Sequence, residues 1–97
     1  MAYGNISVGT SATVIVAKSV SSPPRIALLI SNNSSVIVYL GEDSSVTTSN
    51  GYPLHPGHQL ILDYDGSIAP FFYRDAVYGR VASGTADVRY WQMVETR

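Results

Sequence analysis

Two histidines three residues apart, His55 and His58, are the side chains of this sequence most suited to chemistry. Imidazoles are common ligands of transition metals and common general bases. Two ligands do not make a metal site, however, and the Pro56-Gly57 pair between them is typical of a turn and excludes a helical HExxH arrangement. We therefore expect two loop histidines that bind no metal, and a protein without a cofactor.

Acidic and hydroxyl side chains also fall short of a recognisable site. The stretch DYDG, residues 63–66, lacks the further oxygen ligands of a calcium loop, and a strand that ends in an Asp-Gly turn explains it. Serines are numerous, but none lies in a nucleophile-elbow pattern. We predict no catalytic residues and no enzymatic activity. A small carbohydrate-binding or enzymatic β-sandwich that uses Asp63, His55 and His58 is the least favoured alternative.

The composition limits the partners that this chain can have. It has 97 residues, a net charge of −1, no cysteine and no cluster of Lys and Arg, so nucleic acid is not expected as a partner and disulfides are excluded. The longest apolar run, IALLI at residues 26–30, is too short to span a membrane. The N-terminus has neither the basic region nor the apolar core of a secretion signal, so we expect synthesis in a cytoplasm.

Charged side chains are scarce, at 13% of the residues, while hydrophobic residues reach 45%. Before Glu42 the only charged side chains are Lys18 and Arg25. A small domain normally needs surface charge to stay soluble and monomeric. We therefore expect part of the surface to be covered by a partner.

The elements that must position these side chains are strands. Val, Ile, Thr, Tyr and Ser dominate, and Gly, Pro, Asn or Asp recur about every eight to twelve residues, as in all-β sandwiches and barrels. We predict a single-domain, antiparallel β-sandwich, jelly-roll-like or Ig-like, with about eight short strands. The expected strands are Asn5–Val8, Ala12–Lys18, Arg25–Asn32, Val36–Gly41, Gly51–Leu54, His58–Asp63, Val77–Ser83 and Ala86–Val94, with a possible further one at Ile68–Tyr73.

Three details of these strands can be tested. In ATVIVAK, Val14 and Val16 are expected on one face and Thr13 and Ile15 on the other. Both faces of RIALLIS are apolar, so this strand is expected at the centre of a sheet or against a neighbouring subunit. The segment VYGRVASGTADVRYWQMV is expected to form a hairpin that turns at SGT. The whole chain, 1–97, is expected to be one domain, with an N-terminal arm at 1–11 and an aromatic insertion loop at 69–76.

Exposed aromatic residues are the best candidates for contact with another protein, because aromatics and Arg are enriched at interface hot spots. Three consecutive aromatics precede an arginine in APFFYRDA, and a strand cannot bury all three in one core. They either plug an open end of the sandwich or anchor another subunit. The candidate interaction residues are Tyr3, Phe71, Phe72, Tyr73, Arg74 and Trp91.

The order of the motifs is similar to that of a known class of proteins. An arginine-led apolar strand is followed by I-x-N-x-S, by a strand ending in VYLG, by VTTSNGYPL-x-PG and by SGTADVR. This succession, from about Ala12 to Glu95, resembles small β-sandwich structural proteins of tailed-bacteriophage virions. The segment Ala69–Ala76 departs from the pattern as an insertion.

The resemblance implies a virion structural protein without catalytic residues. The expected function is that of a capsid cement or decoration protein, which lies on the capsid surface and bridges neighbouring coat subunits. Its expected partners are the major capsid protein or another virion protein, and further copies of itself as a homodimer or homotrimer. The alternative is a tail, baseplate or fibre-associated module that binds another virion protein or a host surface glycan.

Overall fold

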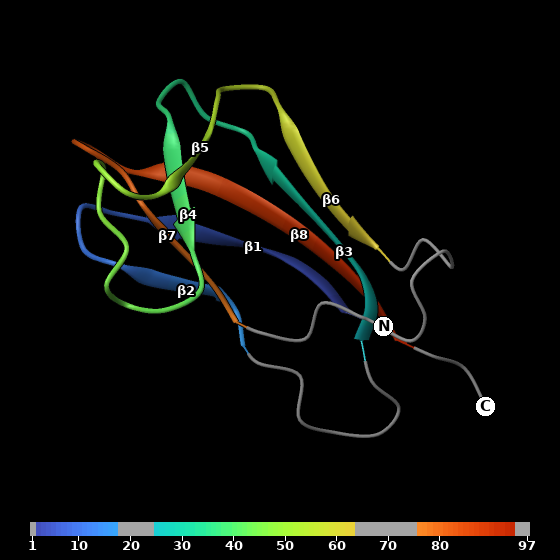
Figure 1. The fold of residues 1–97 in the computed structure, drawn as a ribbon. Coiled ribbons are helices and arrows are strands. Elements are labelled where there is room, and N and C mark those ends of the chain that lie inside the picture. The colour runs from blue at the N-terminus through green and yellow to red at the C-terminus, as the bar shows by residue number, and fades with distance from the viewer. Residues whose placement is uncertain (1, 18–24, 64–75, 95–97) are drawn as a thin grey trace.

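The structure, a computed structural model, describes residues 2–17, 25–63 and 76–94. These residues form two four-stranded antiparallel sheets that lie face to face (Figure 1). Sheet A contains, in spatial order, β1 (Ala2–Val8), β8 (Ala86–Val94), β3 (Arg25–Asn32) and β6 (Gln59–Asp63). Sheet B contains β2 (Thr13–Val16), β7 (Val77–Arg80), β4 (Val38–Gly41) and β5 (Tyr52–Leu54).

The strand pairing is nested, as if one long hairpin had been rolled up. The first strand pairs with the last, β2 with β7, β3 with β6, and β4 with β5, all antiparallel. The β3–β8 and β4–β7 pairs then complete the two sheets. The predicted all-β sandwich is confirmed, and the pairing is that of a jelly roll. The described residues include no helix that is long and apolar enough to cross a membrane.

Apolar side chains from the two inner faces form the core between the sheets. Leu28, Ile30 and Val88 of sheet A and Val38 of sheet B are fully buried. Tyr90 and Leu60 are partly buried and pack against this cluster. Strand β3 lies between β8 and β6, so the central position predicted for RIALLIS is confirmed.

Two sequence-based expectations are wrong. Strands β7 and β8 do not form a hairpin, because the Ser83–Thr85 turn carries the chain from sheet B to sheet A. Alternating burial on two consecutive strands is the same for a hairpin and for a connection between sheets, so the pattern could not separate them. In β2 a bulge between Val14 and Val16 turns both Ile15 and Val16 inward and breaks the expected alternation.

The observed strand bounds differ from the expected ones mainly at the ends. Strand β1 starts at Ala2, well before the expected Asn5, so much of the expected arm at 1–11 is a strand of sheet A. Strands β3 and β8 have the expected bounds. The possible strand at Ile68–Tyr73 and most of the expected insertion loop lie outside the described residues.

Candidate interaction surface

Two of the candidate interaction residues lie side by side on the outer face of sheet A. Tyr3 of β1 is the register partner of Trp91 of β8. Their exposed fractions are 81% and 45%, whereas the preceding residue of β8, Tyr90, points inward and packs against the core. Successive residues of a strand point to opposite faces of the sheet. Because Tyr90 points into the core, Trp91 and its register partner Tyr3 point to solvent.

The same row continues across the other two strands of sheet A. Trp91 is also the register partner of Leu29 in β3, and Leu29 is the partner of Ile61 in β6. Leu29 is partly buried and Ile61 is 51% exposed. Tyr3, Trp91, Leu29 and Ile61 thus form one apolar row across all four strands, which we call the outer row.

Polar side chains flank the outer row on the same face. The next row along the strands consists of Asn5, Arg89, Ser31 and Gln59. A shallow depression of about 170 Å³ lies between the two rows, and its lining includes Trp91, Leu29 and Arg89. The surface therefore combines an aromatic and aliphatic strip with a polar border, which is the usual anatomy of a protein interface.

Arg89 and Asp87 form an ion pair on the outer face of sheet A. Both Nη2 and Nε of Arg89 donate to Oδ2 of Asp87, at 3.2 and 3.3 Å, and Nδ2 of Asn33 donates to the same oxygen at 3.2 Å. The hydrogen bond from Asn33, with the smaller effect of Arg89, lowers the pKa of Asp87 below its ordinary value of 3.8. Asp87 therefore stays ionised at neutral pH and compensates Arg89 locally.

The other four candidate residues, Phe71, Phe72, Tyr73 and Arg74, lie outside the described residues. The choice between a plug and an anchor for these residues therefore stays open. Sequence reasoning missed Leu29 and Ile61 as members of the outer row. The signal was present, because RIALLIS has apolar residues on both faces and its outer-face residues must meet side chains of its neighbours.

The histidines occupy a tight turn between β5 and β6. The backbone N–H of His58 donates to the carbonyl of His55 at 3.0 Å, and Gly57 has a φ of +78°, a left-handed conformation that glycine adopts without strain. Both imidazoles are exposed, with ring centroids 5.9 Å apart. Among the described residues no three His, Cys, Asp or Glu side chains lie close enough together to hold a metal ion.

A carbohydrate-binding or enzymatic site built from His55, His58 and Asp63 requires these three residues to lie close together, and the fold separates them. Asp63 ends β6, whereas the two histidines precede the start of this five-residue strand. The ends of such a strand are about 13 Å apart. A common site for the three residues would need a rearrangement of β6.

A buried asparagine, Asn32, connects this turn to the rest of the fold. Its Nδ2 donates to the carbonyls of Val36 at 2.7 Å and Leu54 at 2.8 Å, and its Oδ1 accepts from the backbone N–H of Ser34 at 3.1 Å. Its backbone carbonyl accepts from the N–H of Gly57 at 2.9 Å. The I-x-N-x-S and PL-x-PG motifs therefore meet here, and their contacts stabilise the fold.

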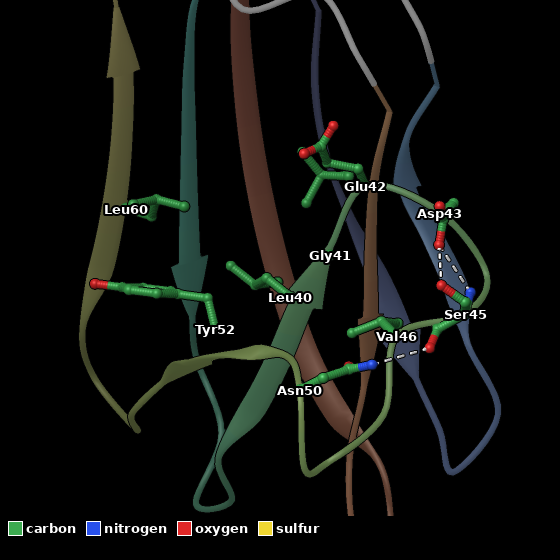
Figure 2. Close-up of a pocket in the computed structure, with 10 residues that line it drawn as sticks. Leu40, Gly41, Glu42, Asp43, Ser45, Val46, Asn50, Tyr52 and Leu60 are labelled. Atoms are coloured by element: carbon green, nitrogen blue, oxygen red, sulfur yellow. Dashed lines mark hydrogen bonds between the residues drawn. The ribbon is translucent and has the colours of Figure 1, made fainter.

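An open hollow with a volume of about 660 Å³ is lined by residues of β4, β5 and β6 and of the loop that follows β4. Figure 2 shows Tyr52 and Leu60 on one side of the hollow and Glu42 and Asp43 on the other. Asp43 is engaged locally, because its Oδ1 accepts from the N–H of Ser45 at 2.9 Å and from the Ser45 hydroxyl, which lowers the pKa of Asp43. Tyr52 is 61% exposed and is the aromatic surface of the hollow.

The chain was compared with protein-family models, with curated proteins and with solved structures, and none of them matches it.

Proposed function

We propose that this protein is a structural protein of a bacteriophage virion, a capsid cement protein that binds the shell surface and bridges neighbouring coat subunits. The outer row carries the proposal. A continuous apolar strip that includes Trp and Tyr and runs across a whole sheet face is characteristic of a surface that binds another protein.

The physical properties of sheet A support contact as the basis of its function. Neither outer-row aromatic is needed to fill the core, because Leu28, Ile30 and Val88 are already fully buried beneath the sheet. Arg89 and Asp87, on the border of the outer row, form an ion pair with each other, so docking an apolar surface over these two side chains does not leave either charge without a partner. Many symmetric copies on a shell make a modest contact area per copy sufficient.

The order of motifs adds support for a virion protein in particular. The residues of I-x-N-x-S and PL-x-PG are joined by hydrogen bonds through Asn32, so the motifs describe one connected structural unit rather than independent turns. A protein that shares these motifs in this order is therefore expected to share this loop arrangement.

Co-sedimentation tests the proposal. Purified protein is mixed with undecorated shells assembled from the major capsid protein of the phage that encodes this chain, and the shells are pelleted. We expect saturable co-pelleting. A protein that leaves the shells bare but pellets with isolated tails would contradict the cement function and favour a tail-associated one.

A tail, baseplate or fibre-associated module that binds a host glycan is the second candidate, and the hollow favours it. The exposed ring of Tyr52 offers a stacking surface, and Asn50 and Glu42 are polar lining residues. A glycan array would test this alternative, and binding abolished by Tyr52→Ala but retained by Tyr3→Ala would support it over shell binding.

A further inference from the structure

The four edge strands of the two sheets differ in how well they are protected against pairing with another strand. Strand β2 has four residues and a bulge, and β5 has three residues and contains Pro53, which cannot donate a backbone hydrogen bond. Strand β6 has five residues and ends in the charged Asp63. Bulges, prolines, charges and short lengths are the usual protections of a sheet edge.

Strand β1 has none of these protections. It has seven residues, AYGNISV, without charge or proline, and it pairs with β8 in unbroken register from Ala2 to Val8. Among the described residues, no backbone hydrogen bond joins β1 to any strand other than β8. The outward backbone N–H and C=O groups of β1 therefore form a regular row of donors and acceptors that matches another extended strand.

We propose that β1 is the self-association edge of this protein, where a second copy adds its own β1 antiparallel across a twofold axis. A twofold contact uses the same patch on both copies and closes after two, so no further chain is recruited. The uncharged sequence of β1 brings no like charges together at the axis. The two copies of sheet A then form one continuous sheet of eight strands.

This pairing also accounts for the position of Tyr3, which is the most exposed large hydrophobic side chain of those described, at 81%. Tyr3 lies at the end of the outer row, with a neighbour on β8 only. In the dimer a second β1 lies on its other side, and the two outer rows face the same direction. The dimer then presents two contact strips, which is what a protein that bridges two coat subunits needs. The pairing itself does not depend on that function and is measured on the protein alone.

Analytical ultracentrifugation and a matched pair of variants test the pairing. Asn5 and Gln59 lie in the same row of the outer face, at opposite edges of sheet A, and both are exposed. With the axis at Asn5, the middle residue of β1, Asn5→Glu brings like charges together there. The new carboxylate lies opposite Arg89 of its own chain but replaces the hydrogen bond from Asn5 to Asp87, so a thermal melt of the variant is measured alongside. Gln59→Glu adds the same charge at the β6 edge.

We expect a wild-type mass of two chains, at least a tenfold weaker dimer in Asn5→Glu, and no change in Gln59→Glu. Salt should partly restore the Asn5→Glu dimer, because the Debye length shrinks to about 3 Å at 1 M, and this recovery distinguishes repulsion from misfolding. A wild-type monomer, a trimer, or a dimer weakened by Gln59→Glu instead would overturn the proposal.

Disulfide trapping locates the edge, because the chain has no cysteine of its own. Single cysteines at Tyr3, Asn5 and Ser7 are oxidised alone and in pairwise mixtures, with Gln59→Cys as the control. Residues opposite each other in a paired strand have Cα atoms about 4.5–5.5 Å apart, within the range for a disulfide. We expect crosslinks that peak at one β1 position or one pair. Equal or stronger crosslinking at Gln59, or none on β1 in a dimeric protein, would contradict the proposed edge.

Shell binding by a protein that stays monomeric would refute the pairing and leave the proposed function intact.

Discussion

Tyr3 and Trp91 are register partners in the β1–β8 pair, and both side chains face away from the core of the sandwich. Residues 88 positions apart in the chain, from 3 to 91, are thus neighbours because the first and last strands pair. Leu29 and Ile61 extend this pair into the outer row. The surface proposed to bind a partner is therefore a direct product of the nested strand order.

The outer-row aromatics should contribute little to stability. We expect Tyr3→Ala to change the free energy of unfolding by about 0.5 kcal/mol or less, as for most surface substitutions, and Trp91→Ala by about 1 kcal/mol. Leu28→Ala, at a fully buried position, should cost about 2–5 kcal/mol. Urea denaturation of the three variants provides the comparison. A loss in Tyr3→Ala as large as that in Leu28→Ala would mean that the ring is a core residue.

Asn32→Asp should make the stability of the protein strongly pH-dependent. The amide nitrogen donates to two carbonyl oxygens, and an ionised carboxylate in its place would repel them in a fully buried site. Burial raises the native pKa of the introduced carboxyl above its unfolded value of about 3.9. The variant is therefore closest to wild type below about pH 4 and loses stability as the pH rises through the native pKa. Thermal melts at pH 3.5 and pH 7 measure this, and a pH-independent loss would contradict it.

Gly79→Ala should destabilise the sandwich because the added methyl group would displace side chains of the core. A Cβ at Gly79 would lie 2.8 Å from Cδ1 of Ile15 and 3.2 Å from Cγ1 of Val38, where the inner faces of the sheets meet. Overpacking of this kind costs about 1–3 kcal/mol. Gly9→Ala is the matched control, because nothing lies within 4 Å of its Cβ and its φ is not positive. We expect the control to be neutral or slightly stabilising in the same thermal melt.

Asp87 should contribute to stability at neutral pH and lose its contribution in acid. Its native pKa lies below the ordinary value of 3.8 because of the hydrogen bond from Asn33 and the nearby Arg89. Because the native pKa is lowered, the ionised carboxylate contributes to the free energy of unfolding above pH 3.8. This contribution is lost as the pH falls through the native pKa. We expect Asp87→Asn to be less stable than wild type at pH 6, with a difference that narrows below 3.8. A constant difference between the two melting curves would argue against this role.

The fold class was predictable because strand alternation and turn residues are local signals. RIALLIS has apolar residues on both faces, and this property correctly predicted a central strand. The path between β7 and β8 was not predictable, because a glycine turn at Gly84, with a φ of +73°, serves a connection between sheets as well as a hairpin. The β2 bulge is also non-local, since it depends on how Val14 and Val16 meet β7.

The candidate surface was predictable only in part. Tyr3 and Trp91 were identified by residue type, but their adjacency depends on the pairing of the two ends of the chain. Ile61 joined the row only through its register with Leu29. Asn32 lies in a polar run, SNNSS, that gives no local sign of which amide is buried.

Shell binding by single aromatic variants tests the central claim most directly. Co-sedimentation isotherms with undecorated shells are measured for wild type, Tyr3→Ala, Trp91→Ala and Tyr52→Ala, the last being an equally drastic change at an exposed tyrosine of sheet B. Hot-spot aromatics contribute about 2 kcal/mol or more to binding, so Trp91→Ala should raise the apparent Kd about thirtyfold or more. Tyr3→Ala should also weaken binding. Tyr52→Ala should leave the apparent Kd unchanged. Binding that survives both outer-row substitutions, or that is lost only in Tyr52→Ala, would contradict the assignment of the outer row as the contact surface.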